Sequence, residues 1–516
     1  MPLPLFRLLL IECDVFFFSE EKGIHVNEAM PPIGLMYLSS FLKKHLAGEA
    51  RVEVGLIDMA VERLTRESLS AQPTPQLIGL RALTKNKELF HQTAALCREI
   101  FPEVPIIGGG PYVTADYDAA LLDPHLECGV SGEGEYPLLE MARRLLAGDR
   151  AGLLTVNGVV RRDGVSGEIL QNPPQQKPDL NAEPMPDYSL IDMDRFAQVI
   201  CNAKVKRRQG VITASRGCPF QCIYCHNIFG RKIRARTPEN VLDEISYLYH
   251  EHQVRDFFFV DDVFNISAKR TIGLCNLIQQ SGLKIHMYFQ NGFRGDLCTR
   301  EVVDACVEAG MILVNFAVES SSPRLQALMK KNLDVDKLAE MIHYTCTHDI
   351  IVGINSMIGF PSETLEEAEG TIRYLAQFKK VALPFFFIAR YYPHTEMYAM
   401  AVADGFPQSM LDRHSEKVYH DVTLPTPTLS AGQLQGLFQK YLVEVFFNRE
   451  RLENVQRILQ RFFTPEDIRD FYSTLLNRRI VDVEREVLGR GFGPTSESGG
   501  APPRSAHAEP HDRGEA

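Results

Sequence analysis

The chain reads Ser215-Arg216-Gly217-Cys218-Pro219-Phe220-Gln221-Cys222-Ile223-Tyr224-Cys225-His226-Asn227 directly after a short apolar run at residues 211–214. Its three cysteines, Cys218, Cys222 and Cys225, have the spacing Cys-x3-Cys-x2-Cys. A loop this short can wrap three corners of a cubane [4Fe–4S] cluster, and the fourth iron is then left without a protein thiolate. An iron with open coordination sites can bind the amino and carboxylate groups of a methionine moiety. The spacing therefore predicts a redox-active cluster that binds a sulfonium compound close enough to transfer an electron to it.

A zinc site is the competing interpretation of these cysteines. Structural zinc prefers paired Cys-x2-Cys elements and a fourth ligand, and no second pair occurs nearby. His226 directly follows Cys225, so it is poorly placed to chelate the same ion. The iron–sulfur cluster is the favoured assignment.

Around this loop, residues 200–395 alternate apolar strand candidates with amphipathic helices such as 238–250, 268–281 and 300–308. The six strand candidates are 211–214, 256–260, 284–290, 312–317, 351–358 and 384–389. Such repeats predict a partial (β/α)6 barrel, in which functional side chains gather at the carboxyl ends of the strands.

Residues 1–150 show the same alternation with shorter units. The expected strands are 8–11, 52–57, 77–80, 105–107 and 128–130, and the expected helices are 35–45, 87–100 and 138–146. This order predicts a doubly wound, Rossmann-like α/β domain that binds its ligand at the carboxyl ends of the strands.

The remaining segments have distinct compositions. Residues 151–199 include a proline-rich stretch, 172–187, and we expect a semi-rigid linker there. Residues 396–490 are expected to form a helical region, whose part 431–488 packs as a separate all-α piece, and residues 491–516 a disordered tail.

Composition limits the classes of partner and location. The 516 residues are 45% hydrophobic and 23% charged, with a formal net charge of −11, which argues against a nucleic-acid partner. No uninterrupted apolar stretch is long enough to span a bilayer, because Arg7, Glu12 and Asp14 interrupt the apolar start of the chain. Eleven cysteines, eight of them scattered, fit a reducing cytoplasm better than a disulfide framework.

The cysteine motif resembles that of the radical S-adenosylmethionine superfamily, and the resemblance extends over residues 200–392. Tyr224 is the aromatic residue before the last cysteine, which in that family touches the adenine. At later strand ends the resemblance implies S-adenosylmethionine contacts from Asp261, Asp262, Arg294, Asp296, Glu319 and Ser320. The alternative for Asp261 and Asp262 is capping of the following helix, and the alternative for Arg294 and Asp296 is a structural ion pair.

The segment 353–364, Gly-Ile-Asn-Ser-Met-Ile-Gly-Phe-Pro-Ser-Glu-Thr, resembles the fifth strand of the same family. The family more often has glycine where Ser362 stands.

In the front domain, glycines follow consecutive strands, so a bulky ligand can approach the backbone closely. Neither a Walker pattern nor Gly-x-Gly-x-x-Gly is present, and ordinary tight turns are the alternative. Together with the radical domain, the segments resemble the cobalamin-binding domain that precedes many radical enzymes. The resemblance implies cobalamin contacts from Thr84, Gly108, Gly109, Gly110, Gly132 and Glu133. No Asp-x-His-x-x-Gly occurs there, so no histidine is evident as a lower axial ligand.

The paired resemblance implies a cobalamin-dependent radical methyltransferase, which methylates an unactivated carbon through a 5′-deoxyadenosyl radical and methylcobalamin. Its implied partners are a small-molecule, lipid or natural-product substrate and an electron donor such as flavodoxin or ferredoxin. Arg390, Tyr391 and Tyr392 follow the sixth strand and are candidates for contact with an aromatic or lipid-like substrate, whereas core packing explains the preceding phenylalanines.

Other functions stay open at this point. A cobalamin-dependent cyclase or rearrangement enzyme shares the same layout, and a non-catalytic cobalamin or redox sensor is the alternative of another class. A methylthiotransferase is disfavoured, because Cys13, Cys97 and Cys128 are too dispersed for a second cluster.

Overall fold

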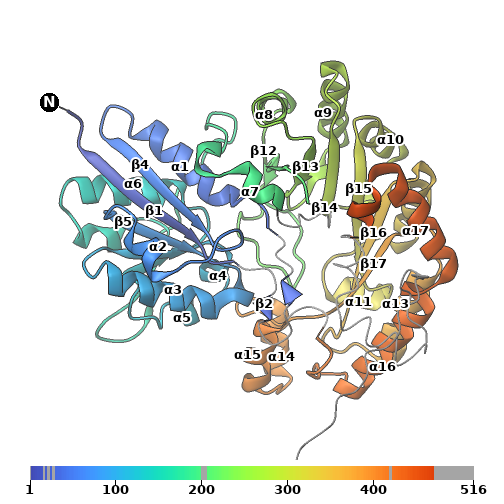
Figure 1. Cartoon of the computed structure of the whole chain (residues 1–516). Coiled ribbons are helices and arrows are strands. Elements are labelled where there is room, and N and C mark those ends of the chain that lie inside the picture. Colours follow the sequence, from blue (N-terminus) through green and yellow to red (C-terminus); the bar gives the residue numbers. More distant parts are fainter. Residues whose placement is uncertain are drawn as a thin grey trace, which may run out of the picture. The chain divides into compact units, whose positions relative to one another are not determined.

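The first sheet of the computed structural model has seven strands in the order β4-β1-β5-β6-β7-β8-β9. Its strands β4, β1 and β5 are labelled in Figure 1. Their bounds are β1 Leu5–Glu12, β4 Arg51–Asp58, β5 Leu77–Arg81, β6 Ile106–Gly109, β7 Cys128–Val130, β8 Val159–Arg162 and β9 Ile169–Gln171. The strands from β4 to β7 are parallel, in the order of a flavodoxin-like doubly wound sheet, as predicted. The structure describes residues 2–14, 18–19, 24–25, 29–198, 206–417 and 421–469, all within the unit Met1–Phe471.

Alternation along β1 explains why helices cover both faces of this sheet. Phe6, Leu8 and Leu10 pack with α1 (Ile33–His45) and α6 (Glu135–Leu146). The intervening Leu9 and Ile11 belong to a second core on the opposite face. That core is completed by α2 (Arg66–Ser70), α3 (Lys87–Ile100), α4 (Gly110–Ala115) and α5 (Tyr117–Ala120). A strand buried on both sides contains a continuous apolar run, as residues 8–11 of β1 do.

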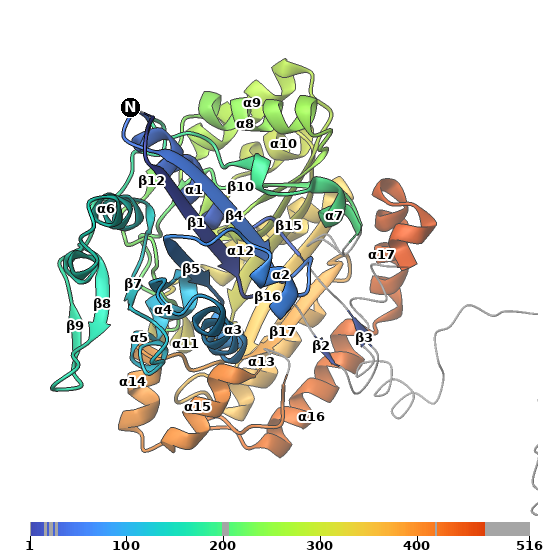
Figure 2. The ribbon, with the colours of Figure 1, turned by 60° about the vertical axis from the view of Figure 1, so that its left-hand side comes forward.

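The segment 151–199 is more ordered than a linker. Strands β8 and β9 lie within it and extend the first sheet antiparallel beyond β7 (Figure 2). The backbone of Val159 and Val160 pairs with β7, and both side chains are buried. Because β9 has only three residues, its sequence pattern is too short to predict a strand.

The second sheet has six parallel strands in the order β10-β13-β14-β15-β16-β17. They span β10 Gln209–Ile212, β13 Asp256–Phe259, β14 His286–Phe293, β15 Met311–Glu319, β16 Ile351–Ile358 and β17 Leu383–Ile388. The interleaved helices include α8 Pro238–Glu251, α9 Ala268–Ser281, α10 Arg300–Glu308, α11 Pro323–Leu328, α12 Val335–Thr345 and α13 Leu365–Ala376. Helices α8, α9 and α10 lie side by side on the sheet (Figure 1). The predicted partial (β/α)6 barrel is confirmed.

The C-terminal helices correct one expectation. The described ones are α14 Glu396–Ala403, α15 Gln408–Glu416, α16 Ala431–Tyr441 and α17 Arg449–Phe462. Rather than forming a separate piece, α16 and α17 pack on the barrel. Arg451 Nη1 donates to the Ala382 carbonyl at 2.7 Å, and the Tyr441 hydroxyl donates to the Pro384 carbonyl. An amphipathic helix needs a surface on which to bury its apolar face, and the last barrel strand provides it. Residues 470–490 and the expected tail 491–516 lie outside the described residues.

Within the described ranges, no helix has both the length and the apolar character needed to cross a membrane.

Candidate functional site

The three motif cysteines lie in the loop of a small hairpin. Strand β11 (Ser215–Arg216) pairs antiparallel with β12 (Arg234–Ala235), and residues 217–233 connect them. Gly217 has φ +99°, and a Cβ there would lie against the Lys232 carbonyl, so only glycine fits. The Cys218 N–H donates to the Gly230 carbonyl at 3.1 Å, which closes the loop. The hairpin pairing and this hydrogen bond therefore constrain the loop that carries the thiols, at the carboxyl end of β10.

Exposure separates these cysteines from the others. Cys218 and Cys222 are half-buried and Cys225 is exposed, whereas the other seven cysteines that the structure describes are buried. A hydrogen bond with the Cys225 thiol lowers the pKa of Cys222 to about 6, while burial raises the pKa of Cys218. The loop thus presents accessible thiols, one of which ionises readily, as metal ligation requires.

The spacing of the thiols fits a cluster better than one ion. Among the described residues, no three His, Cys, Asp or Glu side chains converge as ligands of a single metal ion. A cubane cluster needs no such convergence, because each thiolate binds a different iron. The residues present therefore fit a [4Fe–4S] cluster.

Tyr224 of the cysteine loop and Glu319 at the end of β15 are brought together. The Tyr224 hydroxyl lies 3.3 Å from Glu319 Oε1, and Lys331 Nζ donates to the same oxygen at 2.9 Å. Glu319 ends β15 with φ +62°, after a register shift against β16. A non-glycine residue in this region is strained, and such strain gathers at functional sites. The cysteine loop is fixed to this position because the Ile223 N–H donates to the Met329 carbonyl at 3.1 Å.

Asp261 and Asp262 brace the hairpin. The Ser215 hydroxyl donates to Asp261 Oδ1 at 2.5 Å, and the Ala214 N–H donates to Oδ2 at 3.1 Å. Asp262 accepts from the Gly217 N–H at 3.2 Å. Burial raises the pKa of Asp261 to about 6. Neither aspartate caps α9, whose N-cap is Ser267, so they support the cysteine loop through its backbone.

The other predicted S-adenosylmethionine contacts, Arg294, Asp296 and Ser320, interact with neighbouring residues of the chain. Arg294 forms a two-point ion pair with Asp296, at 2.8 and 3.0 Å, and its guanidinium lies 3.8 Å from the centre of the Phe220 ring. Ser320 is fully buried, and the Ser322 N–H donates to its hydroxyl at 3.2 Å. The ion-pair interpretation of Arg294 and Asp296 is therefore confirmed, and Ser320 lies in the core.

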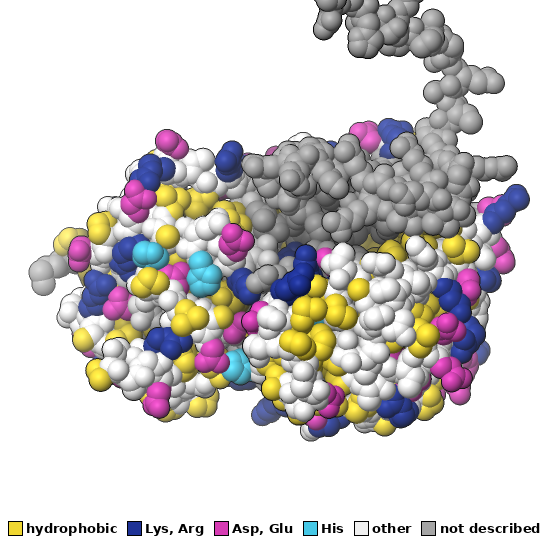
Figure 3. Space-filling view, turned by 90° about the horizontal axis from the view of Figure 1, so that it is seen from below, with side chains coloured by type: hydrophobic (Ala, Val, Ile, Leu, Met, Phe, Trp, Pro, Cys, Tyr) yellow, Lys and Arg dark blue, Asp and Glu magenta, His cyan; other side chains and the backbone are white. Residues whose placement is uncertain are grey.

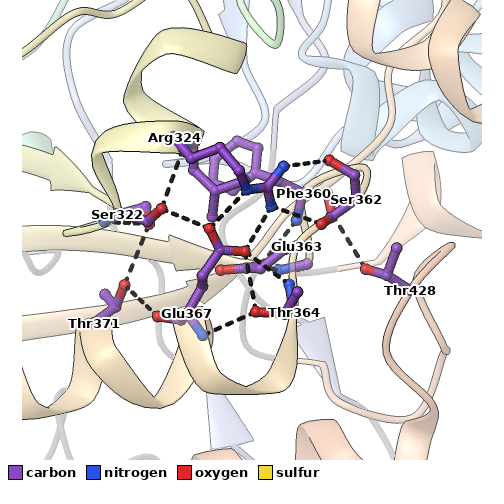
Figure 4. Close-up of polar contacts among 12 residues, drawn as sticks. Ser322, Arg324, Phe360, Ser362, Glu363, Thr364, Glu367, Thr371 and Thr428 are labelled. Atoms are coloured by element: carbon purple, nitrogen blue, oxygen red, sulfur yellow. Dashed lines mark hydrogen bonds and ion pairs between the residues drawn. The ribbon is translucent and has the colours of Figure 1, made fainter.

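Figure 4 shows a polar network at the carboxyl end of β16. The N–H groups of Gly359 and Phe360 both donate to Glu363 Oε2. Burial raises the pKa of Glu363 to about 8. Ser362 has φ +59°, which explains why glycine suits this position. Here Arg324 binds the Ser362 hydroxyl at 2.9 Å and the Ser362 carbonyl at 2.7 Å, which holds the left-handed turn in place.

In the front domain, the predicted glycines differ in what they face. A Cβ on Gly108 would meet Phe90 and Val113 of the core, and one on Gly110 (φ +78°) would meet the Arg81 side chain. Gly109 has nothing within 4 Å of such a Cβ, so the end of β6 is open. Thr84 begins a short helical turn, Thr84–Asn86, directly after neighbouring β5.

A charged group that the sequence patterns did not predict lies at the same sheet edge. Arg81 donates to Glu12 at 2.6 Å and to Asp14 at 2.5 Å, at the ends of β5 and β1. Glu12 Oε2 and Asp58 Oδ2 are buried acceptors without a partner in the described structure. Burial raises the pKa of Asp58 to about 7. Gly109 leaves the end of β6 open, and the buried Glu12 and Asp58 oxygens at the same sheet edge lack partners in the described structure. In a doubly wound sheet ligands bind at this edge, so the site fits a large polar cofactor such as cobalamin.

Glu133 and Gly132 correct the predicted cobalamin contacts. Glu133 is 4% exposed, and its two carboxylate oxygens accept from Arg216 and Arg234 of the cysteine hairpin. The Gly132 N–H donates to the Thr114 hydroxyl at 2.9 Å, and a Cβ on Gly132 would meet the Gln175 side chain. Both residues therefore belong to the contact between the domains. Sequence patterns do not show which charges meet between domains, and this is why the contact was missed.

The residues after β17 also differ from expectation. Arg390 and Tyr391 are buried: Arg390 Nη2 donates to the Asp421 carbonyl at 2.7 Å, and the Tyr391 hydroxyl donates to the Gly359 carbonyl at 2.5 Å. Tyr392 is half-buried beside His226, with ring centres 5.8 Å apart. Phe385 and Phe387, expected in the core, are instead half-buried, and their rings stack at 5.7 Å.

These phenylalanines belong to a row of half-buried positions that lie on β14 to β17 or directly follow β13. The row comprises Val260, Gln290, Ala317, Asn355, Phe385 and Phe387. Ala317, Asn355 and Phe385 are direct neighbours across β15, β16 and β17. Because helices cover the outer face of the sheet, the row marks the inner face of the barrel.

Charges are mixed on the face shown in Figure 3, where Lys and Arg side chains alternate with Asp and Glu over the described residues.

Comparisons with known proteins agree with both halves of the fold. The radical SAM superfamily model matches residues 212–375, and the B12 binding domain model matches residues 23–142. The chain is 28% identical over 430 residues to an uncharacterized methyltransferase of Pyrococcus horikoshii, covering 82% of this chain and 89% of that protein. It is 24% identical over 357 residues to the anaerobic magnesium-protoporphyrin IX monomethyl ester cyclase of Rubrivivax gelatinosus, covering 68% of this chain and 63% of that protein.

A solved structure shares the fold. The radical S-adenosylmethionine methyltransferase TsrM from Kitasatospora setae, with tryptophan substrate and an S-adenosylmethionine analogue bound, matches 76% of this chain and 74% of its own. The TM-score is 0.61 at 18% identity. With a B12-binding domain followed by a radical SAM domain, the chain belongs to the cobalamin-dependent radical SAM enzymes, whose cofactors are a [4Fe–4S] cluster, S-adenosylmethionine and cobalamin.

Proposed function

We propose that this enzyme is a C-methyltransferase that transfers a methyl group from S-adenosylmethionine to an unactivated carbon of a small-molecule, lipid or natural-product substrate. The observation that carries the proposal is the 28% identity to a methyltransferase over 89% of that protein, a match that spans both cofactor domains. The direct contact between Arg216 of the cysteine hairpin and Glu133 of the cobalamin domain supports it, because methyl transfer needs both cofactors in one reaction space.

When bound, the cluster supplies the electron that cleaves S-adenosylmethionine, and cobalamin supplies a methyl carrier. The chain's own residues bind and orient these groups. Cys218, Cys222 and Cys225 would hold the cluster, and Tyr224 and Glu319 would contact the nucleoside and the methionine ammonium. In the cobalamin domain, Thr84 and the open end of β6 at Gly109 would contact the cofactor.

The inner face of the barrel is the proposed substrate surface. The stacked rings of Phe385 and Phe387 offer an apolar wall, and Asn355 on the neighbouring strand offers one amide for hydrogen bonding. A largely apolar wall with few polar groups is typical of sites for ring-containing or lipid-like molecules. An electron donor such as flavodoxin or ferredoxin completes the proposed set of partners.

A cyclase is the second candidate, because the chain is 24% identical over 68% of its length to the Rubrivivax gelatinosus cyclase. The radical SAM assignment makes the chain an enzyme, so a non-catalytic sensor is disfavoured.

Product analysis tests the proposal. Protein reconstituted anaerobically with iron and sulfide is incubated with S-adenosylmethionine and titanium citrate, with and without cobalamin, and the nucleoside products are quantified. A methyltransferase is expected to give S-adenosylhomocysteine only in the cobalamin-loaded sample, in addition to 5′-deoxyadenosine. If loaded protein gives 5′-deoxyadenosine and no S-adenosylhomocysteine, methyl transfer is wrong and ring formation or rearrangement is favoured.

A further inference from the structure

The stem of the cysteine hairpin is joined to the cobalamin domain by four charged side chains, three of them buried and one half-buried. Arg216 Nη1 donates to Glu133 Oε2 at 2.7 Å and to Glu135 Oε1 at 2.6 Å. Arg234 Nη2 donates to the other oxygen of Glu133. We call these four residues the stem ion cluster. Both cations come from the hairpin, and both anions come from the loop after β7, where α6 begins.

The side chains of the stem ion cluster are largely shielded from solvent, and their opposite charges pair with one another. The side chains of Glu133, Arg216 and Glu135 are only 2%, 6% and 7% exposed, and that of Arg234 is 17% exposed. Two carboxylates face two guanidinium groups, and the exposed Lys177 adds a third cation, whose Nζ lies 3.9 Å from Glu133 Oε1. The rings of Tyr37 and Phe229 lie 5.0 and 5.4 Å from the Arg216 guanidinium and keep water away from it. Each buried charge is therefore neutralised by its partners, and removing one leaves another uncompensated.

The cluster lies at the base of the loop that carries the cysteines. Arg216 and Arg234 are paired residues on β11 and β12, and the connecting residues 217–233 contain all three thiols. Cys218 follows Arg216 by two positions. A displacement of the stem therefore moves the whole cysteine loop.

Further contacts tie the same two loops together through the segment 151–199. Lys177 Nζ donates to the Phe229 carbonyl at 2.5 Å, on the cysteine loop. Gln175 Nε2 donates to the carbonyls of Ser131 and Glu133, at 2.9 and 2.8 Å, on the loop after β7. Two neighbouring residues of one segment thus hold both sides of the stem ion cluster.

Ion pairs between two surfaces fix their relative orientation more strictly than apolar contacts do. A buried ion pair contributes little net stability over an apolar contact of the same size, but its hydrogen bonds hold one relative arrangement. Apolar contacts alone tolerate sliding. The reaction of two cofactors is sensitive to their separation, because misplacement by about 1 Å can reduce a rate on the order of 100-fold.

We propose that Glu133 and Glu135 are positioning residues that set the placement of the iron–sulfur cluster relative to cobalamin. They act through Arg216 and Arg234 and touch neither cofactor. The proposal rests on the two cofactors of the family and not on methyl transfer, because ring formation needs the same placement.

The test uses the full-length protein and the magnetic coupling between its two cofactors. A reduced [4Fe–4S] cluster and cob(II)alamin each carry unpaired electron spin, and their dipolar coupling weakens steeply with separation. Frozen samples of the wild type and of the Glu133→Gln and Glu135→Gln variants are poised so that both signals are present. Pulsed electron paramagnetic resonance then measures the coupling, and iron content and cobalamin binding are determined on the same samples. We expect both variants to retain iron and cobalamin but to show a weaker or broadened coupling.

Glu140→Gln is the matched control, because Glu140 lies on the same helix α6 but its 45% exposed side chain pairs only with Arg144 of that helix in the described structure. This control is expected to keep the wild-type coupling. A wild-type coupling in both stem variants, with iron and cobalamin fully loaded, overturns the proposal. Loss of iron from Glu135→Gln with cobalamin binding retained also overturns it, because the glutamates then fold the loop rather than place it. If Glu133→Gln does not fold, Glu135→Gln alone decides, since Arg216 keeps one carboxylate in that variant.

Discussion

Lys331 donates a hydrogen bond of 2.9 Å to the carboxylate of Glu319, and the two side chains are only 9% and 11% exposed. The Tyr224 hydroxyl lies against the same oxygen. The strained end of β15 is thus held by a buried cation beside the cysteine loop, and this cation has a direct effect on stability.

Replacing that cation by an apolar side chain of similar length, Lys331→Met, leaves the Glu319 carboxylate buried without compensation. Breaking a buried ion pair in this way costs about 3–5 kcal/mol of unfolding free energy. Urea unfolding of anaerobically handled protein, followed by circular dichroism, measures the loss. Lys330→Met is the control, because Lys330 forms an exposed pair with Glu396 that is worth about 0–1 kcal/mol. Equal stability of the two variants would show that the Glu319 carboxylate does not depend on Lys331.

Cys222→Ala is expected to abolish iron–sulfur cluster assembly, because a cubane held by three thiolates loses one of its three attachments. Iron and sulfide analysis after anaerobic reconstitution measures the loss, together with the visible absorption of the cluster. Cys298→Ala is the matched control, since Cys298 is buried and lies outside the hairpin sequence. Retention of four irons by Cys222→Ala would contradict the ligand assignment.

Glu363 predicts a pH dependence of stability. Burial raises its pKa from 4.5 to about 8, so the folded protein holds this proton more tightly than the unfolded chain. The stabilisation from this proton is fully present below the unfolded value and is lost as the pH rises through the folded value. Stability should therefore fall with a slope of up to about 1.4 kcal/mol per pH unit across that window.

The variant Glu363→Gln isolates this contribution, because its amide oxygen can still accept from the N–H groups of Gly359 and Phe360. Asp58, whose pKa is raised to about 7, contributes equally to both proteins and cancels in the difference. Urea titrations at several pH values should show that the free energy of unfolding of the variant increases relative to that of the wild type as the pH rises. Parallel curves would mean that Glu363 is ionised throughout.

Gly292→Ala is expected to destabilise the barrel and weaken the brace of the cysteine hairpin. Gly292 has φ +74°, and a Cβ there would collide with the backbone carbonyl of Asp261. A strained left-handed residue alone costs about 1–3 kcal/mol, and the collision adds to it. Gly432→Ala in α16 is the control, because it meets nothing within 4 Å and should stabilise the helix by roughly 0.5–1 kcal/mol. Thermal unfolding compares the two variants, and a neutral Gly292→Ala would contradict the prediction.

Sequence patterns predicted the parallel strands of both sheets because strands buried on two faces contain continuous apolar runs, as in Phe257, Phe258 and Phe259 of β13. The cysteine spacing is equally local, so it could be predicted without any contact between distant residues. β8 and β9 were missed because they join a sheet through backbone pairing, and their side chains show no strong alternation.

The roles of charged residues depended on partners far away in the chain. Arg216 and Glu133 are 83 positions apart, and nothing in either local sequence shows that they meet. Asp261 stands at a strand end in the expected place, yet its oxygens accept from Ser215 and Ala214. A motif fixes the residue and its approximate position, whereas its role depends on which donors the fold brings to it.

Strand β17 is the last of its sheet, and an outermost strand with free carbonyls is a template on which a second polypeptide can pair. Tyr441 and Arg451 occupy the carbonyls of Pro384 and Ala382 and cover this border. During synthesis, however, β17 leaves the ribosome well before these two residues are made. During synthesis the edge strand β17 is therefore exposed until α16 and α17 have been made. A chain truncated before α16 should keep every cofactor ligand identified above and still be lost to aggregation.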